Sequence, residues 1–293
     1  MLAELLVESG IALTFNMLEV GALPIEGETE PSHALLEAFP GSKLALIEID
    51  PDLCEKLNRS APPGMRYYPC ALGRTEELRT LYLTRGPACT SLYEPDERYA
   101  DLFNLLDAMR VREISDVDTI SLDTMQRRHA LGALDFLKID VQGAELDIFQ
   151  GGTAALSHVL MILCEVEFVP LYKNQPLFCD IDVFLRERGF MFHKFLGMAG
   201  RVMKPMAVHG TGMFPVNMMW SDAVYTRDVF DAGRLAPEKL LKLAVLFDIY
   251  ESKDFALHLV KHYDAVNGTR LAATYTQRIT ASGEWLEKKV FSK

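Results

Sequence analysis

Residues 134–145, with the sequence LDFLKIDVQGAE, constrain the fold of this chain more than any other stretch. They begin as a short apolar run and continue into an acid, a glutamine and a glycine. Apolar residues then recur at helical spacing as far as Gly151 and Gly152. This pattern predicts a buried parallel strand, a tight turn and a helix. Ligands bind beyond the carboxyl ends of the strands in open α/β sheets, so we expect Asp140 to lie at a ligand site.

Lys138 lies two residues before Asp140 and therefore on the same face of the predicted strand. A lysine in an apolar strand is costly to bury unless it pairs with an acid or reaches solvent. Two interpretations stay open here. The two residues form a structural ion pair, or Lys138 keeps a ligand-binding Asp140 ionised.

Strands and helices alternate along most of the chain. Strands are predicted at 15–20, 43–50, 65–72, 78–84, 118–122, 159–168, 190–196 and 222–226. After Pro237 the apolar residues recur at helical spacing. The alternation predicts a doubly wound, mostly parallel α/β sheet with crossover helices. We expect this domain to span residues 1–233 and a C-terminal helical extension to span 234–293.

The composition excludes several classes of protein. The formal net charge of −11 argues against a sequence-independent grip on nucleic acid phosphates or anionic membranes. No apolar run is long enough for a membrane span, and the acidic residues 1–10 do not form a signal peptide. Five widely spaced cysteines without a C-x-x-C pair are typical of reduced thiols. We therefore expect a cytoplasmic protein.

The turn after the first strand, Glu19-Val20-Gly21-Ala22, is where a nucleotide-type cofactor would sit, because a glycine lets the ligand approach the backbone. The G-x-G-x-x-G pattern is absent, which disfavours a pyrophosphate cradle. The alternative is an ordinary turn glycine.

The second predicted strand ends in two acids. Asp50 is placed to accept hydrogen bonds from a ribose diol, and Glu48 shares its face two residues earlier. Because Pro51 follows, Asp50 also suits the N-cap of the next helix. We favour ribose binding over capping.

Seven segments together resemble the FkbM-type methyltransferases, a family of S-adenosylmethionine-dependent enzymes with the class I methyltransferase sheet. They are 18–22 (LEVGA), 49–51 (IDP), 70–73 (CALG), 119–123 (TISLD), 135–145 (DFLKIDVQGAE), 165–167 (EVE) and 170–178 (PLYKNQPLF). The KIDVxGAE core is the most specific of them. In place of the family's usual Asn-x-Gly after Gly-Ala, this chain has Leu23-Pro24-Ile25-Glu26.

The resemblance implies S-adenosylmethionine as the cofactor and a hydroxyl, often of a sugar or natural product, as the acceptor. It places Glu19 and Gly21 near the methionine and ribose portions and Asp50 on the ribose hydroxyls. Cys70, Ala71 and Leu72 would border the adenine. From their places in the first turn and at the end of the strand, we also expect Ala22 and Asp140 to contact the cofactor.

An alcohol acceptor loses a proton during methyl transfer, so a nearby base is useful. Asp140 on one strand and Glu165 and Glu167 on the next are candidates, and their mutual repulsion would raise their pKa values unless a cation relieves it. We favour Lys138 as that cation over a divalent metal, because no histidine has metal-site spacing with these acids. Alternatively, Glu165 and Glu167 only line the acceptor pocket.

We thus expect Asp140, Lys138 and Glu165 to be catalytic. The residues expected to bind the acceptor are Glu145, Glu167, Tyr172 and Gln175. Thr90 and Ser91 have two open roles, as donors to a ligand or as turn residues.

The expected activity is O-methylation of a carbohydrate or related polar metabolite. The alternatives are a nicotinamide-dependent oxidoreductase and a binding protein that kept the fold without turnover. We expect a small-molecule or glycan acceptor, no nucleic acid partner and a possible homodimer.

Overall fold

The computed structural model describes residues 1–23, 30–281, 283 and 285. The chain forms two compact units. The larger comprises Asn16–Ile25 and Leu44–Arg227, and the smaller comprises Met1–Phe15, Glu26–Lys43 and Asp228–Lys293. The departure from the family's usual first loop falls mainly on residues 24–29 and so lies outside the described residues.

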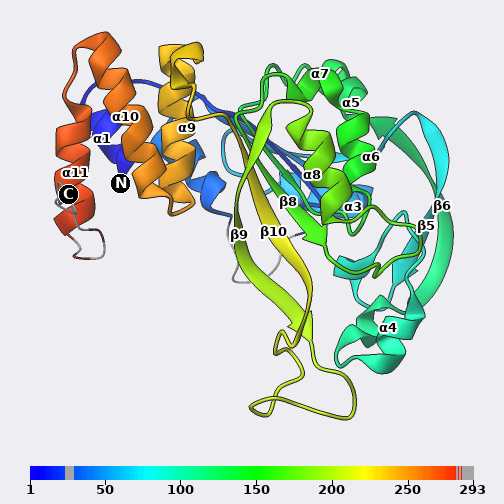
Figure 1. Cartoon of the computed structure of the whole chain (residues 1–293). Helices are drawn as coiled ribbons and strands as arrows, with labels where there is room; N and C mark the ends of the chain where they lie inside the picture. Colours follow the sequence, from blue (N-terminus) through cyan, green and yellow to red (C-terminus); the bar gives the residue numbers. More distant parts are fainter. Residues whose placement is uncertain (24–29, 282, 284, 286–293) are drawn as a thin grey trace. The chain divides into compact units, whose positions relative to one another are not determined.

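A seven-stranded sheet organises the larger unit (Figure 1). Its strand order is β3-β2-β1-β7-β8-β10-β9. The strands are β1 (Asn16–Val20), β2 (Lys43–Glu48), β3 (Met65–Pro69), β7 (Phe136–Ile139), β8 (Met161–Glu167), β9 (Phe190–Arg201) and β10 (Asn217–Arg227). β1 is parallel to β7, β7 to β8 and β2 to β3, whereas β10 is antiparallel to both β8 and β9. The predicted doubly wound, mostly parallel sheet is confirmed, with the change of winding direction at β1 and β7.

A second sheet has the order β4-β6-β5, formed by β4 (Ala71–Gly73), β5 (Glu77–Thr84) and β6 (Val111–Ser121). The single strand predicted at 65–72 is therefore wrong. The chain leaves the large sheet at Pro69, which has no N–H to donate, and joins the small sheet at Ala71. The piece predicted at 118–122 is only the end of the eleven-residue β6, because the polar outer residues of β6 hide its extended pattern.

Helices α5 (Leu122–Arg128), α6 (Glu145–Gln150), α7 (Thr153–Leu156) and α8 (Phe178–Arg186) lie beside one another over the sheet (Figure 1). They pack on the apolar side chains of one sheet face, among them Leu18, Leu137, Ile139, Ile162 and Val166. Glu19, Lys138 and Glu165 alternate with these residues and so project from the opposite face. The other helical segments of the larger unit are α3 (Pro51–Asn58), η2 (Pro87–Cys89), α4 (Glu97–Leu102) and η3 (Leu106–Met109).

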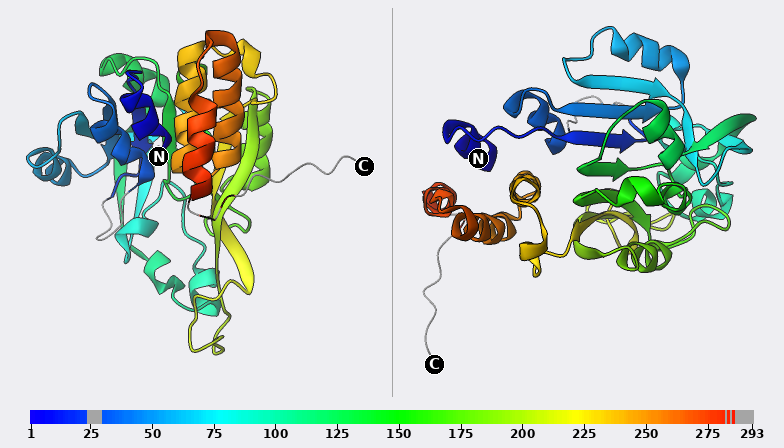
Figure 2. Two further views of the ribbon diagram at one scale, coloured as in Figure 1. Left: turned by 90° about the vertical axis from the view of Figure 1, so that its left-hand side faces the viewer. Right: turned by 90° about the horizontal axis from the view of Figure 1, so that it is seen from above.

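The smaller unit is helical, with α9, α10 and α11 running side by side in Figures 1 and 2. It contains α1 (Leu2–Glu8), η1 (Pro31–His33), α2 (Ala34–Ala38), η4 (Ala232–Arg234), α9 (Pro237–Ile249), α10 (Lys253–Asn267) and α11 (Leu271–Ala281). Buried Asp248 accepts hydrogen bonds from Leu2 N at 2.7 Å and Tyr275 Oη at 2.5 Å. The expected helical extension is confirmed, and it shares a compact unit with the N-terminal segment that we assigned to the first domain. A functional boundary at residue 233 stays a prediction.

Of the helices that the structure describes, none combines the length and the apolar character needed to span a membrane.

Candidate active site

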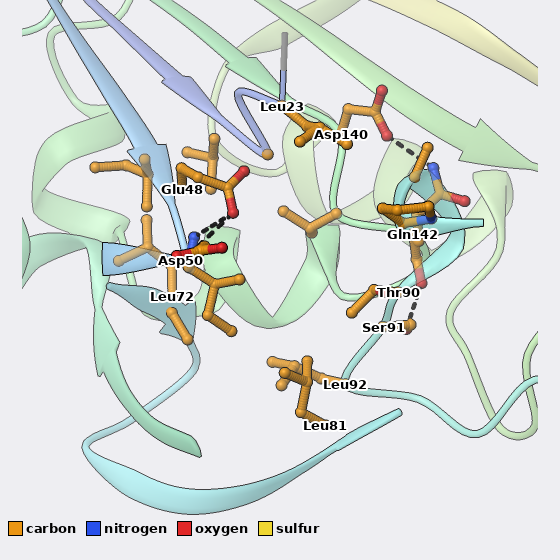
Figure 3. Close-up of a pocket in the computed structure, with 18 of the residues that line it drawn as sticks. Leu23, Glu48, Asp50, Leu72, Leu81, Thr90, Ser91, Leu92, Asp140 and Gln142 are labelled. Carbon is orange, nitrogen blue, oxygen red and sulfur yellow. Dashed lines mark hydrogen bonds between the residues drawn. The ribbon is translucent and has the colours of Figure 1, made fainter. Parts of the chain in front are cut away.

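A pocket of about 400 Å³ lies at the carboxyl ends of β1, β2 and β7 (Figure 3). Most of the predicted cofactor residues line it, namely Glu19, Gly21, Asp50, Cys70, Ala71, Leu72 and Asp140. Ala22 is not part of the lining. The sequence analysis missed the wall opposite β2, which the small sheet supplies through Leu81, Leu83 and Arg112. No motif marks these residues, because only the pairing of β5 with β6 brings them to the pocket.

Gly21 is required by the chain itself. Its φ is +80°, and a Cβ built on it would lie 1.8 Å from the backbone oxygen of Asp140. Gly21 N and Ala22 N both donate to Ile47 O, at 3.1 and 3.0 Å. Any side chain here would separate the β1 turn from the tip of β7, so the glycine lets three strand ends meet at one pocket.

The two acids at the tip of β2 are satisfied by their own backbone. β2 ends at Glu48, whose Oε1 accepts hydrogen bonds from Ile49 N at 2.8 Å and Asp50 N at 3.1 Å. Asp50 is the N-cap of α3, and its Oδ1 accepts from Asp52 N and Leu53 N at 2.9 and 3.1 Å. The prediction that Asp50 ends the strand is wrong, and the capping role that we ranked second is present. Both acids still line the pocket.

Lys138 pairs across the strands, with its Nζ 3.8 Å from Glu19 Oε1. Glu19 and Lys138 are register partners in β1 and β7, which places their side chains side by side on one face. The structural pair that we considered for Lys138 thus forms with Glu19. Both residues line the pocket, so the pair presents a nearly neutral wall to a ligand.

Gln142 is the partner that the structure gives to Asp140, and the sequence analysis missed it. Its Nε2 donates to Asp140 Oδ1 at 2.8 Å and to Glu165 Oε2 at 2.5 Å. Its Oε1 accepts from Tyr172 Oη at 3.0 Å, and its backbone oxygen accepts from Ser91 Oγ at 2.6 Å. Figure 3 shows the contacts to Asp140 and Ser91. In the sequence, the one feature that singles out Gln142 is its place just before Gly143. In the structure this place is a turn in which Gln142 has a φ of +60°.

Three carboxyl groups lie behind Gln142, of which Glu145 and Glu167 are buried and Glu165 is half-buried. Burial, followed by the charges of Asp140 and Glu167, raises the pKa of Glu165 well above its ordinary value. Burial and the charges of Glu145 and Asp140 raise the pKa of Glu167 in the same way. Burial also raises the pKa of Glu145 to about 7, even though its Oε1 accepts from Val141 N and Gly143 N. Burial and neighbouring charges therefore favour the protonated form of Glu165 and Glu167.

The predicted acceptor residues lie behind the pocket wall. Tyr172 and Gln175 are buried, and neither they nor Glu145, Glu165 and Glu167 belong to the pocket lining. Gln175 Oε1 accepts from Tyr172 N at 2.5 Å, which ties the two residues together. Gln175 Nε2 and Glu167 Oε2 are buried without a hydrogen bond among the described residues.

Ser91 takes the turn-shaping role. Besides its bond to Gln142, its Oγ accepts from Tyr93 N at 2.9 Å. The side chain thereby fastens the loop after β5 to the turn after β7. Within the part of the chain that the structure describes, no three or more His, Cys, Asp or Glu side chains are arranged to hold a metal ion.

The model of the methyltransferase FkbM domain matches residues 19–192, more than half of the chain. The chain belongs to the FkbM methyltransferase family. This membership decides for a methyltransferase that uses S-adenosylmethionine and against the nicotinamide-dependent oxidoreductase that the sequence left open. A comparison with curated proteins finds no match.

Three solved structures are similar to this chain at low identity and low TM-score. The magnesium protoporphyrin IX methyltransferase ChlM of Synechocystis PCC 6803, with bound SAM, is 10% identical at a TM-score of 0.35. The match covers 77% of this chain and 76% of ChlM. A putative methyltransferase from Thermoplasma acidophilum is 10% identical at a TM-score of 0.32. The match covers 74% of this chain and 70% of that protein. A duf574 family protein from Streptomyces avermitilis is 14% identical at a TM-score of 0.36. The match covers 78% of this chain and 79% of that protein. At such scores these likenesses add nothing to the fold assignment, which rests on strand order and family membership.

The pocket of this FkbM methyltransferase fits S-adenosylmethionine in chemistry as well as in size. Leu53 and Leu72 give it an apolar wall suited to a flat purine. Glu48 and Asp50 offer carboxylate oxygens at one end, which suit the hydroxyl groups of a ribose. Asp140 adds a carboxylate on the wall formed by β7, where negative charge suits a sulfonium. Burial raises the pKa of Cys70 to about 12, so its thiol borders the pocket as a neutral group.

Proposed function

We propose that this FkbM methyltransferase methylates a hydroxyl group of a carbohydrate or a related polar metabolite, with Asp140 accepting or orienting the hydroxyl proton. The observation that carries the proposal is the position of Asp140. It is a half-buried carboxylate in the pocket wall, and Gln142 holds one of its oxygens at 2.8 Å. A carboxylate fixed in this way can receive a hydrogen bond from an alcohol in the same pocket.

The chain contributes mainly by positioning. When bound, S-adenosylmethionine supplies a methyl group activated by a sulfonium. Glu48 and Asp50 would hold the ribose, and Gly21 leaves the backbone bare beside it. Asp140 directs the acceptor oxygen by taking its proton in a hydrogen bond, while Gln142 prevents rotation of the carboxylate away from the pocket.

Glu165 takes a supporting role in this proposal. Its raised pKa favours the protonated form, and a protonated carboxyl cannot accept a further proton as a base. It accepts from Gln142 Nε2 and thereby helps to fix the amide that holds Asp140. Lys138 likewise acts on the electrostatics of the pocket through Glu19.

We assign Glu145, Glu167, Tyr172 and Gln175 to the wall behind the acceptor. Glu145 ties the turn together by accepting from Val141 N and Gly143 N, and Tyr172 reaches the acceptor side only through Gln142. They would shape the acceptor pocket through the turn at 141–143.

The decisive experiment is a methyl-transfer screen that measures formation of the demethylated cofactor. Sugars, sugar nucleotides and glycans form the test set. Each active compound is paired with its deoxy analogue, with the corresponding amino sugar and with an RNA control. We expect turnover with a hydroxyl-bearing compound and none with its deoxy analogue. Transfer to amines or RNA alone would contradict the proposal, as would cofactor binding without any turnover across the set.

A further inference from the structure

The hairpin of β9 and β10 carries a concentration of exposed apolar side chains. They are Met198, Met203, Met206, Met213, Phe214, Val216 and Met218. Met206 and Val216 are 66% and 65% exposed. Soluble proteins rarely expose large apolar residues in such a cluster unless the surface is an interaction site.

A second segment of the chain extends this surface. Asn104 N donates to Val202 O at 3.1 Å, and Lys204 N donates to Leu102 O at 2.8 Å. Exposed Leu102 and Leu105 thus lie beside the hairpin loop. We call the seven hairpin residues together with Leu102 and Leu105 the hairpin-tip surface. It holds nine of the sixteen exposed large apolar side chains among the described residues.

The charge of the hairpin differs from that of the chain. Residues 190–221 contain no Asp or Glu but include Lys194, Arg201 and Lys204, in a chain with a net charge of −11. The acids of the segment that carries Leu102 and Leu105 are partly offset, since Arg110 pairs with Glu97, Asp101 and Asp107, and Arg85 pairs with Asp107. The hairpin is therefore positively charged on an otherwise acidic protein, and Lys204 is its exposed cation.

The hairpin reaches past the end of the parallel strands. Trp220 of β10 pairs with Glu167, the last residue of β8, so the loop at 202–216 lies beyond the carboxyl end of β8 (Figure 1). The pocket opens at the same edge of the sheet, at the carboxyl ends of β1, β2 and β7. A surface that engages the hairpin-tip surface therefore faces the edge from which an acceptor enters.

We propose that the hairpin-tip surface binds a phospholipid bilayer that contains anionic lipids. Methionine, valine and phenylalanine side chains enter the boundary between headgroups and acyl chains, and exposed Lys204 lies among the headgroups. The rest of the protein is negatively charged and is repelled by the same headgroups, so contact is confined to the hairpin-tip surface. The proposal stands apart from the identity of the methyl acceptor.

Vesicle sedimentation with the full chain tests this proposal. The probes are vesicles of phosphatidylcholine alone and vesicles of phosphatidylcholine mixed with phosphatidylglycerol, at low and high salt. The test variant combines Met206→Ser with Met213→Ser. The matched control is Val183→Ser, which removes an exposed valine from α8. Light scattering records the oligomeric state, and circular dichroism confirms that both variants fold.

We expect the wild-type chain to sediment with the mixed vesicles, less with phosphatidylcholine alone and less at high salt. The double variant should bind the mixed vesicles at least about 10-fold more weakly, whereas Val183→Ser should bind as the wild type does. Absence of vesicle binding by the wild-type chain would overturn the proposal. An equal loss of vesicle binding in Val183→Ser and in the double variant would overturn it as well. A dimer that the double variant converts to a monomer would identify a second copy as the occupant instead.

Discussion

The acids at the tip of β2 and those around the tips of β7 and β8 have opposite surroundings. Glu48 and Asp50 accept two backbone N–H groups each and line the open pocket. Glu165 and Glu167 are crowded together with Asp140, and burial raises the pKa of both glutamates well above the ordinary value. Burial and like charges favour the neutral form of a carboxyl group.

The difference separates two tasks within one site. The acids at β2 offer carboxylate oxygens to the hydroxyl groups of the cofactor, and the acids behind Gln142 support the turn after β7. Asp140 lies between them, since it lines the pocket and also bonds to Gln142. We therefore expect Asp140 to be the acid whose charge matters most for turnover.

The sharpest test of this comparison is Asp140→Asn. The variant keeps the size of the side chain and removes its charge, so methyl transfer should fall by roughly 10²–10⁴-fold. The thermal unfolding midpoint should stay close to that of the wild type, as measured beside the rate with an established acceptor. A rate near the wild-type value would show that the turn after β7 is structural and that Asp140 neither accepts nor orients the proton.

The second test uses the dependence of stability on pH. The pKa of Glu145 is about 7 in the folded chain against an ordinary 4.5, so the unfolded chain loses this proton first as pH rises. Stability should therefore fall between about pH 4.5 and 7, by at most about 3 kcal/mol from this group at 1.36 kcal/mol per unit. Glu145→Gln should flatten that part of a denaturation profile. Glu165 and Glu167 act in the same direction and should leave a residual slope.

The third test separates capping from ribose binding at Asp50. Asp50→Ala should weaken S-adenosylmethionine binding by about 1.5–3 kcal/mol, the cost of losing a hydrogen bond to a charged group. It should also destabilise α3 by about 1 kcal/mol. Asp50→Asn keeps an N-cap acceptor and should restore the stability but only part of the affinity. Calorimetry and thermal unfolding measure the two effects. Asp52→Ala, outside the pocket, is the control, and an equal loss of affinity there would remove Asp50 from the site.

The smallest expected effect belongs to Glu165→Gln. A glutamine is neutral, which is the form of Glu165 that its raised pKa favours, and its carbonyl oxygen can still accept from Gln142 Nε2. Turnover should therefore fall by less than about 10-fold, in the same steady-state assay as for Asp140→Asn. If both variants lose activity equally, the proton acceptor is shared between Asp140 and Glu165, and the division into charged and neutral acids is wrong.

The order of elements followed largely from the sequence. Strands such as β1, β7 and β8 are largely apolar runs with one or two charged residues, and the helices after β2 and β7 begin at proline or glycine signals, so their positions were predictable. The ends of the long, half-exposed strands were not predictable. β6 and β9 extend well beyond their predicted ends because pairing with β5 and β10, rather than an apolar pattern, keeps them extended.

The sequence by itself determined the fold class, the edge of the sheet that holds the site and the presence of Asp140 there. Strand periodicity and the βα turns specify these features locally. Tertiary structure alone decided the partners. Lys138 faces Glu19 because of the β1–β7 register, and Asp140 bonds to Gln142 because of the turn's left-handed backbone. A carboxyl group's pKa depends on burial and on charges brought close by folding, so no local pattern could show that the pKa of Glu165 is raised.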